Sequence, residues 1–452
     1  MIVPLGSSFR DPSGFVYVKD GVLLRQVNES YKAHYDLLMQ SGLYAELVAK
    51  GWLIEHAEVD GPGYRTLQPR VVPYVSYPYE WCFSQLQDAA LLTLDILTAS
   101  LERGMVLKDA SAYNIQFIGS RPVFIDTLSF ETYVEGAPWV AYRQFCQHFL
   151  APLALMAYRD VHLRQLLERF LDGVPLDLAT ELLPLRTRAK YGLFAHLHLH
   201  ARSQQRHRDD AAKGERPRIP KLPKFQLLAL IDSLRSAVRG CALPQAKTEW
   251  SDYYDATNYS DEAMAAKEAL VKHLVDDVAH PSDIIHDLGG NTGRFSRLIA
   301  GPTRYVVSHD IDELAIEQSY RAAHEHVLPL VLDLSNPSPA IGWANDERTS
   351  ALERISGGTV LALALVHHLA ISNNVPLAHL AALFARIAKS LIVEFVPKED
   401  SQVRRLLATR EDVFPDYHAA AFEAELSRFF DITQRREVPG TKRTLYAMRR
   451  RG

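Results

Sequence analysis

The sequence predicts an α/β fold with a mainly parallel sheet in its C-terminal half and a smaller α+β fold in its N-terminal half. Two observations support the sheet. Five apolar runs of strand length recur after residue 284, and the last two runs of the chain are joined by a turn too short for a crossover. At 452 residues the chain is longer than one such sheet requires, so at least two domains are expected.

The first apolar run passes directly into a glycine-rich turn. In residues 284–293, IIHDLGGNTG, three glycines in five positions let the backbone turn tightly and approach a ligand closely. The spacing is not the G-x-G-x-x-G of dinucleotide binders, and the G-K-[ST] of a P-loop is absent. The turn therefore indicates a nucleoside-cofactor site at the carboxyl end of a parallel strand, and its spacing does not imply recognition of NAD or of ATP phosphates.

The next two predicted strands end in acids. Residues 304–310 end in Asp310, with Asp312 two positions on, and residues 327–333 end in Asp333. A carboxylate about twenty residues after a glycine-rich turn can accept both hydroxyls of a ribose. Acids at strand ends also cap the helices that follow. Together with Asp287, however, three acids on successive strands favour a cofactor site.

The remaining strands complete the sheet. Residues 359–366 form a continuous apolar run, typical of a central parallel strand buried on both faces, and residues 391–396 form a fifth strand. Residues 429–434 and 444–448 are separated by a short segment containing Pro439 and Gly440. A connection this short joins antiparallel neighbours. The sheet is therefore expected to end in an antiparallel hairpin.

These motifs together resemble the class I S-adenosylmethionine-dependent methyltransferases over about residues 245–452. The glycine turn is similar to the D-x-G-x-x-x-G variant of their first motif, and the sheet to their Rossmann-like sheet with an antiparallel terminal hairpin. The resemblance implies that S-adenosylmethionine is the cofactor, with Asp287 facing its amino acid part, Asp310 its ribose and Asp333 its adenine. The cofactor-binding residues it implies are Asp287, Gly289, Gly290, Gly293, Asp310 and Asp333.

The sequences of three short segments narrow the resemblance further. The segments 250–259, 394–400 and 410–417 are similar to the group of nodulation-protein-related methyltransferases. The aromatic segment 250–259 suits a lid over a cofactor and suits a packed loop equally well. Glu394 is open to two interpretations, as a residue lining the acceptor pocket or as a partner of neighbouring backbone.

Two histidines, His367 and His368, follow the fourth predicted strand. Some small-molecule O-methyltransferases resemble this chain in carrying a histidine base there, which implies His367 as the base for a hydroxyl acceptor. The alternative is that one histidine packs against the cofactor and the other hydrogen-bonds a nearby loop, and such a structural role is the interpretation favoured for His368. The amino-methylating signature [D/N]-P-P-[Y/F] is absent, which argues against methylation of adenine or glutamine nitrogen. The expected function is methyl transfer, favoured at oxygen, to an unidentified small molecule, glycan or protein.

The N-terminal half contains a different motif. Asp109 and Asn114 have D-x-x-x-x-N spacing, and Asp126 ends a later strand. This pattern resembles the catalytic loop and metal-binding acid of kinases and implies a kinase-like fold for residues 1–200. Lys108 before Asp109, Arg25 in place of a phosphate-binding lysine, and the absence of G-x-G-x-x-G from the first thirty residues all depart from that family. We therefore expect a degenerate fold without phosphoryl transfer, with accidental spacing as the alternative.

The polar segment 202–217 predicts a linker at 201–222 between a domain at 1–200 and a methyltransferase domain at 223–452 with a helical lead-in. A net charge of −4 gives no broad attraction to nucleic acid or anionic membrane. Neither a leader pattern nor an apolar run of spanning length is found, so the prediction is a cytoplasmic enzyme. His196, His198 and His200 are expected on a helix, where they would not converge on a metal. A non-catalytic, cofactor-binding scaffold is the second functional hypothesis.

Overall fold

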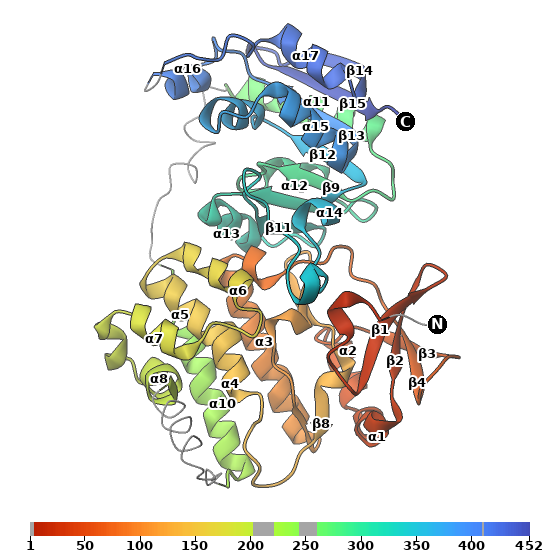
Figure 1. The fold of residues 1–452 in the computed structure, drawn as a ribbon, viewed down its shortest axis with the longest axis vertical. Coiled ribbons are helices and arrows are strands. Elements are labelled where there is room, and N and C mark those ends of the chain that lie inside the picture. The colour runs from red at the N-terminus through yellow and green to blue at the C-terminus, as the bar shows by residue number, and fades with distance from the viewer. Residues whose placement is uncertain (1–3, 202–220, 244–259, 409–410) are drawn as a thin grey trace. The chain divides into compact units, whose positions relative to one another are not determined.

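The computed structural model describes residues 4–201, 221–243, 260–408 and 411–452. The chain forms two compact units (Figure 1). Their segments are Met1–Phe117, Arg121–Ala246 and Ala340–Arg348 in the first unit, and Ile118–Ser120, Lys247–Pro339 and Thr349–Gly452 in the second. The predicted linker segment 202–217 and the aromatic segment 250–259 lie outside the described residues.

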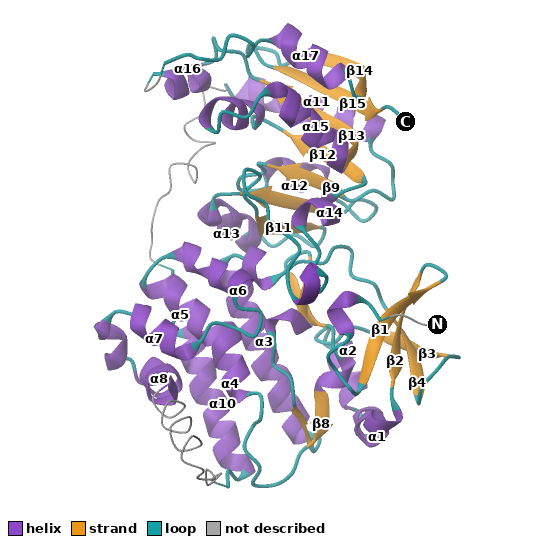
Figure 2. Ribbon diagram, in the orientation of Figure 1, coloured by secondary structure: helices purple, strands orange, loops and turns teal. Residues whose placement is uncertain are grey.

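The second unit is built on a seven-stranded sheet with the order β11-β10-β9-β12-β13-β15-β14 (Figure 2). In chain order the strands are β9 (Ile285–Leu288), β10 (Val306–Asp310), β11 (Val327–Val331), β12 (Gly358–Ala362), β13 (Ala388–Phe395), β14 (Phe430–Glu437) and β15 (Thr444–Arg450). Strands β9 to β13 pair in parallel, whereas β15 runs antiparallel to both β13 and β14. The predicted parallel sheet with an antiparallel terminal hairpin is confirmed.

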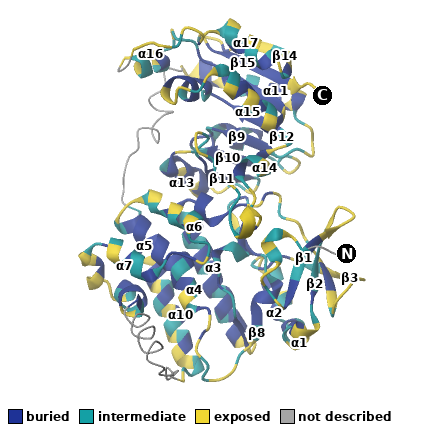
Figure 3. Cartoon of the chain, viewed as in Figure 1, coloured by how far each residue is buried: buried dark blue, intermediate teal, exposed yellow. Residues whose placement is uncertain are grey.

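Helices cover both faces of this sheet. They are α11 (Asp261–Val278), α12 (Arg294–Ile299), α13 (Glu313–Arg321), α14 (Ala351–Ile355), α15 (Leu377–Ile387), α16 (Ser401–Leu407) and α17 (Ala419–Ser427). Val360 packs with α14, α15 and α17, whereas its neighbour Leu361 packs with α11 and α12. Successive side chains of a strand point to opposite faces, so the central strands are buried on both sides (Figure 3).

One predicted strand is too long. The sequence analysis extended the fourth strand over residues 359–366, but β12 ends at Ala362. Ala364 has a φ of 50°, in the left-handed region, so the backbone leaves the sheet direction there. Leu363, Ala364 and Leu365 line a cavity instead. An apolar run alone does not distinguish a buried strand from an apolar loop that closes a cavity.

The first unit combines a small sheet with helices. An antiparallel sheet contains β1 (Gly14–Lys19), β2 (Val22–Val27), β4 (Arg65–Pro69) and β3 (His56–Val59), in that order. Two short antiparallel pairs follow, β5 (Met105–Leu107) with β8 (Phe130–Thr132) and β6 (Ile115–Ile118) with β7 (Arg121–Phe124). The helices include α1 (Lys32–Gln40), α2 (Leu43–Ala49), α3 (Phe83–Glu102), α4 (Tyr142–Phe145), α5 (Ala151–Tyr158), α6 (Leu166–Arg169), α7 (Leu176–Leu182), α8 (Tyr191–Leu193) and α10 (Lys224–Arg239). The contacts of α10 place it in this unit, although the sequence analysis gave residues 223–239 to the methyltransferase domain.

Two further expectations concern this unit and its helices. The alternating histidines are expected on a helix, and His196 and His198 lie in the π-helical turn Phe194–Leu199, which follows α8. His196 bonds Tyr142 and Ser233 through its two ring nitrogens, and His198 bonds Thr187. Among the described residues, no helix has both the length and the apolarity that a membrane crossing requires.

Candidate functional site

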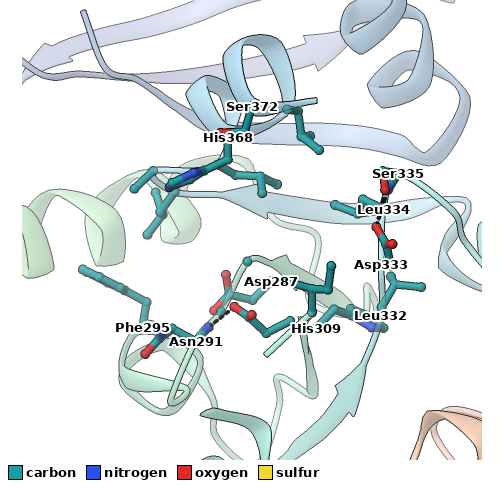
Figure 4. Close-up of a pocket in the computed structure, with 18 of the residues that line it drawn as sticks. Asp287, Asn291, Phe295, His309, Leu332, Asp333, Leu334, Ser335, His368 and Ser372 are labelled. Atoms are coloured by element: carbon teal, nitrogen blue, oxygen red, sulfur yellow. Dashed lines mark hydrogen bonds between the residues drawn. The ribbon is translucent and has the colours of Figure 1, made fainter. Parts of the chain in front are cut away.

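A cavity lies at the carboxyl ends of the parallel strands in the second unit (Figure 4). Of the residues that the sequence predicts at a cofactor site, Asp287, Gly289, Gly290, Asp310 and Asp333 line this cavity. Gly293 immediately precedes α12 and does not line this cavity. Three strand ends that are far apart in the sequence thus contribute acids to one cavity, because the carboxyl ends of parallel strands share one edge of the sheet.

The glycine turn is held against the neighbouring strand by its own backbone. The amides of Gly289 and Gly290 both donate to the carbonyl oxygen of His309, at 2.8 and 2.9 Å. Gly289 has a φ of 77°, a conformation that L side chains rarely adopt. A Cβ atom at Gly290 would lie 2.3 Å from the Ser308 hydroxyl oxygen. The turn therefore requires glycine at both positions to approach β10 this closely.

Asp287 and Asp310 are carboxyls in an unusual environment. Asp287 is buried on β9 and accepts a 2.6 Å hydrogen bond from the Ser296 hydroxyl. Asp310 accepts hydrogen bonds from the backbone amides of Asn291 at 2.8 Å and Asp312 at 2.9 Å. Burial raises the pKa of each carboxyl to about 6. A positively charged or hydrogen-bond-donating ligand is therefore bound favourably by each carboxyl group, because it stabilises the ionised form.

Two further acids, Asp333 and Asp312, follow strand ends and have different roles. Asp333 follows β11 by two residues, lines the cavity and accepts hydrogen bonds from the amide and hydroxyl of Ser335, at 2.8 and 2.6 Å. Asp312 accepts from the amides of Leu314 and Ala315 and so caps α13. The capping interpretation therefore applies to Asp312, whereas Asp310 lies on the cavity wall.

The two histidines that follow β12 are placed differently. His368 lines the cavity and lies across it from Asp287, Asn291 and Phe295, whereas Asp333 and Ser335 lie toward the other side (Figure 4). His367 is fully buried, and within the described part of the chain neither of its ring nitrogens has a hydrogen-bond partner. The two ring centroids are 4.1 Å apart. The predicted base thus lies immediately behind a histidine that reaches the cavity.

Burial keeps both imidazoles neutral. It lowers the pKa of His368 to about 4, with a further contribution from Arg443. It also lowers the pKa of His367 well below the usual range, assisted by His368 and by the cations Arg443 and Lys267. A neutral imidazole can accept a proton, although a low pKa reduces its strength as a base.

A buried charge network, consisting of Lys267, Glu394, Arg443 and Asp400, adjoins this end of the cavity. The Lys267 ammonium donates to a Glu394 carboxylate oxygen at 2.7 Å. Arg443 makes two hydrogen bonds to Asp400, at 2.8 and 3.2 Å, and lies 3.9 Å from Glu394. Lys267 and Arg443 line the cavity. Glu394, for which the sequence left two interpretations, pairs with these cations.

Neither cation was predicted from the sequence, although the position of Lys267 in its helix could have indicated it. In α11 the buried positions Met264, Lys267, Val271, Leu274 and Val278 recur at intervals of three and four residues. A lysine on such an apolar stripe must find a partner or a ligand, because an unpaired buried ammonium is very costly. Arg443 lies in the turn before β15 and had no comparable pattern.

The predicted kinase-like residues also lie together in the first unit. Asp126 forms an ion pair with Arg25 of β2 and accepts hydrogen bonds from the Ser129 hydroxyl and the Leu128 amide. Burial raises the pKa of Asp126, but Arg25 and these donors outweigh it and leave the pKa below its usual value. Asn114 donates to the Ser129 hydroxyl at 3.2 Å. Burial raises the pKa of Asp109, which Asp126 raises further.

Known proteins resemble this chain to different degrees. No family model matches the chain. The N-methyltransferase NodS from Bradyrhizobium japonicum WM9 is 10% identical, with a TM-score of 0.32, over 43% of this chain and 99% of NodS. Magnesium protoporphyrin IX methyltransferase (ChlM) from Synechocystis PCC 6803, solved with bound SAH, is 17% identical, with a TM-score of 0.31, over 45% of this chain and 93% of ChlM.

The sheet order, the antiparallel terminal hairpin and the cavity lined by strand-end acids define the second unit as a class I methyltransferase fold. The nodulation protein NoeA of Rhizobium meliloti (strain 1021) is 37% identical to this chain over 466 residues, which cover 99% of the chain and 96% of NoeA. The chain belongs to the NoeA family. The predicted relation to nodulation proteins is thereby confirmed.

Proposed function

We propose that the second unit binds S-adenosylmethionine and transfers its methyl group to an oxygen atom of an acceptor. The observation that supports this proposal is the placement of Asp333, Asp310 and Asp287 on one cavity wall, at the ends of the adjacent strands β11, β10 and β9. This order suits the adenine, the ribose and the amino acid part of the cofactor in turn. The glycine turn leaves the space that the cofactor needs beside β9.

The same strand order indicates which side of the cavity would bind the methyl acceptor. Beyond β9 in the sheet comes β12, whose carboxyl end leads to Leu363, Leu365 and His368 on the cavity wall. The bound cofactor supplies the methyl group as an electrophile. A hydroxyl acceptor must lose its proton as its oxygen attacks, and the sequence analysis assigned that proton to His367. Because His368 reaches the cavity, we propose that the proton goes to His368 and that His367 positions it from behind.

The proposal is tested first by mass spectrometry of the purified chain under native conditions. Copurified S-adenosylmethionine or its demethylated product, S-adenosylhomocysteine, is expected. The chain is then incubated with S-adenosylmethionine carrying a labelled methyl group and with separate small-molecule, glycan and protein fractions. Label in one fraction identifies the acceptor class, and the chemical stability of the product identifies the acceptor atom. A chain that binds the cofactor but labels no fraction would instead support the non-catalytic scaffold.

Replacing Asp310 with alanine is expected to weaken S-adenosylmethionine binding by about 1–3 kcal/mol, because the ribose hydroxyls lose a charged acceptor. Isothermal titration calorimetry measures the effect. Asp312→Ala is the matched control, since Asp312 caps α13 and lies two residues away. Its loss should lower stability without a comparable loss of affinity. Equal affinity of Asp310→Ala and the parent chain would remove Asp310 from this role.

Raising the pH from about 5 to about 7 is expected to strengthen the binding of S-adenosylhomocysteine and to leave it constant above that range. The pKa of both Asp287 and Asp310 is about 6, and the ligand requires their ionised forms. Binding therefore releases protons below pH 6 and becomes weaker as the pH falls. Calorimetry at a series of pH values measures this slope, which Asp310→Asn should reduce. An affinity independent of pH would contradict the prediction.

We also propose that the first unit is a kinase-like fold that has lost phosphoryl transfer. Arg25 forms an ion pair with the carboxylate of Asp126, the group that would bind a metal ion. We expect no ATP turnover by the full chain in the presence of magnesium, measured as release of labelled phosphate or transfer of label to protein. Phosphoryl transfer that disappears in Asp109→Ala would overturn this expectation.

A further inference from the structure

The amino acid end of the proposed cofactor carries two opposite charges, and only one of them has a partner so far. Its ammonium suits Asp287, the buried carboxyl at the end of β9. Its carboxylate needs a cation within reach of the same place, because an ionised carboxylate removed from water requires a charged or hydrogen-bonding partner. The cavity wall contains two candidates, Lys267 and Arg443.

Lys267 is the candidate that lies near Asp287. Its side chain extends from α11 into the cavity wall and is 4% exposed, so its charge is almost entirely shielded from water. The ammonium lies 5.1 Å from the ring centroid of Phe295, which follows the glycine turn on α12 and lines the same cavity. Asp287 lines the same cavity, and the charge of Lys267 opposes the rise that burial causes in the pKa of that carboxyl. The wall of one cavity therefore contains both a cation and a carboxyl group.

Burial lowers the pKa of Lys267, and the carboxylate of Glu394 opposes that effect by stabilising the charged ammonium. An ammonium has three N–H groups, and Glu394 accepts from Lys267 at 2.7 Å. The Asp400 carboxylate holds the guanidinium of Arg443 through two hydrogen bonds. The two cations and two carboxylates of the network are thus balanced. Arg443 lies in the turn before β15, a strand three places from β9 in the sheet, so it is the less suitable partner for a ligand bound at Asp287.

We propose that Lys267 binds the carboxylate of the cofactor's amino acid end while Asp287 binds its ammonium. The two residues then recognise the amino acid as a zwitterion and fix the direction in which the sulfur and its methyl group face His368. This inference rests on the proposed cofactor site and is independent of the acceptor. Glu394 acts through Lys267 as a positioning residue, because it accepts a hydrogen bond from the ammonium and does not itself line the cavity.

Two ligands that differ only in the carboxylate test the proposal on the unmodified full chain. S-adenosylhomocysteine and its decarboxylated analogue are each titrated into the protein by calorimetry. We expect the analogue to bind about 10- to 100-fold more weakly, the range for loss of one charge-assisted hydrogen bond at about tenfold per 1.4 kcal/mol. Equal affinity for the two ligands would overturn the proposal without any mutation.

Variants then assign the preference to Lys267. In Lys267→Met the two ligands should bind with similar affinity, whereas Arg443→Gln, which also disturbs the network, should keep the parent's preference. A preference retained in Lys267→Met would overturn the assignment. Because that variant leaves Glu394 with a weaker partner, the double variant Lys267→Met/Glu394→Met, which removes both charges of the pair, is measured beside it. It should lose the preference in the same way.

A third ligand separates this inference from the cofactor site itself. 5′-Methylthioadenosine shares the adenine, ribose and sulfur but lacks the whole amino acid. We expect it to bind the parent chain and Lys267→Met equally, since its contacts are with Asp310, Asp333 and the glycine turn. If it binds and the carboxylate preference is absent, only the role of Lys267 is overturned. If neither it nor S-adenosylhomocysteine binds, the proposed cofactor site is overturned as well.

Discussion

Replacing His368 with glutamine is expected to lower the rate of methyl transfer by about 10²-fold, the low end of the range for loss of a general base. The low end applies because burial lowers the pKa of His368 to about 4, which keeps the ring neutral but makes it a weak base. Glutamine retains a similar polar shape, so S-adenosylhomocysteine affinity should change by less than about threefold. The measurements are labelled methyl transfer to the acceptor identified above and calorimetry with S-adenosylhomocysteine.

His367→Gln is the matched variant, since His367 is the neighbouring histidine and is fully buried. If His367 only positions His368, its replacement should lower turnover less than His368→Gln does, with a loss of stability or of cofactor affinity. The reverse result, full turnover in His368→Gln and a large loss in His367→Gln at unchanged affinity, would assign the base to His367 as the sequence predicts. Full turnover in both variants would remove the histidines from proton transfer.

Replacing Glu394 with alanine is expected to lower the free energy of unfolding of the second unit by about 3–5 kcal/mol. Glu394 is completely buried and lies between two cations, at 2.7 Å from Lys267 and 3.9 Å from Arg443. Its removal leaves the Lys267 ammonium without its carboxylate at a position that is only 4% exposed. Denaturation with urea, followed by a probe specific to this unit, measures the change in midpoint.

The control for this prediction is Glu425→Ala. Glu425 pairs with Arg428 on the surface of α17, where the arginine side chain is 61% exposed. An exposed pair of this kind contributes at most about 1 kcal/mol, because water and salt screen it. Equal midpoints for the two variants would show that the charge network contributes no more to stability than a surface ion pair.

The sheet was predictable from local patterns because most of its strands are short, largely apolar runs with clear ends, whereas β14 is mainly polar and was located by the short turn that joins it to β15. The run that misled the prediction, residues 359–366, is apolar for two different reasons: β12 is buried between helices, and Leu363 to Leu365 close a cavity. The assignment of α10 also depended on tertiary contacts. Its amphipathic pattern requires a partner surface but does not specify which unit supplies it.

The cofactor side of the cavity was more accessible to sequence reasoning than the acceptor side. Asp310 follows the glycine-rich turn at the distance typical of a ribose-binding acid, and the resemblance to the methyltransferase motif implied Asp287 and Gly289. His368, Lys267 and Arg443 come from three elements that are remote in sequence, and only the fold brings them together. The choice between His367 and His368 depends on the direction of a single turn, which no residue pattern specifies.

The order of strands at one edge of the sheet has a consequence for synthesis on the ribosome. Strand β15 lies between β13 and β14, so β14, although it is made earlier, joins the sheet only through β15. Residues Leu445 to Met448 of β15 are completely buried. A nascent chain that has emerged as far as β14 therefore exposes the unpaired edge of β13, which attracts other strands and chaperones, until β15 has left the exit tunnel.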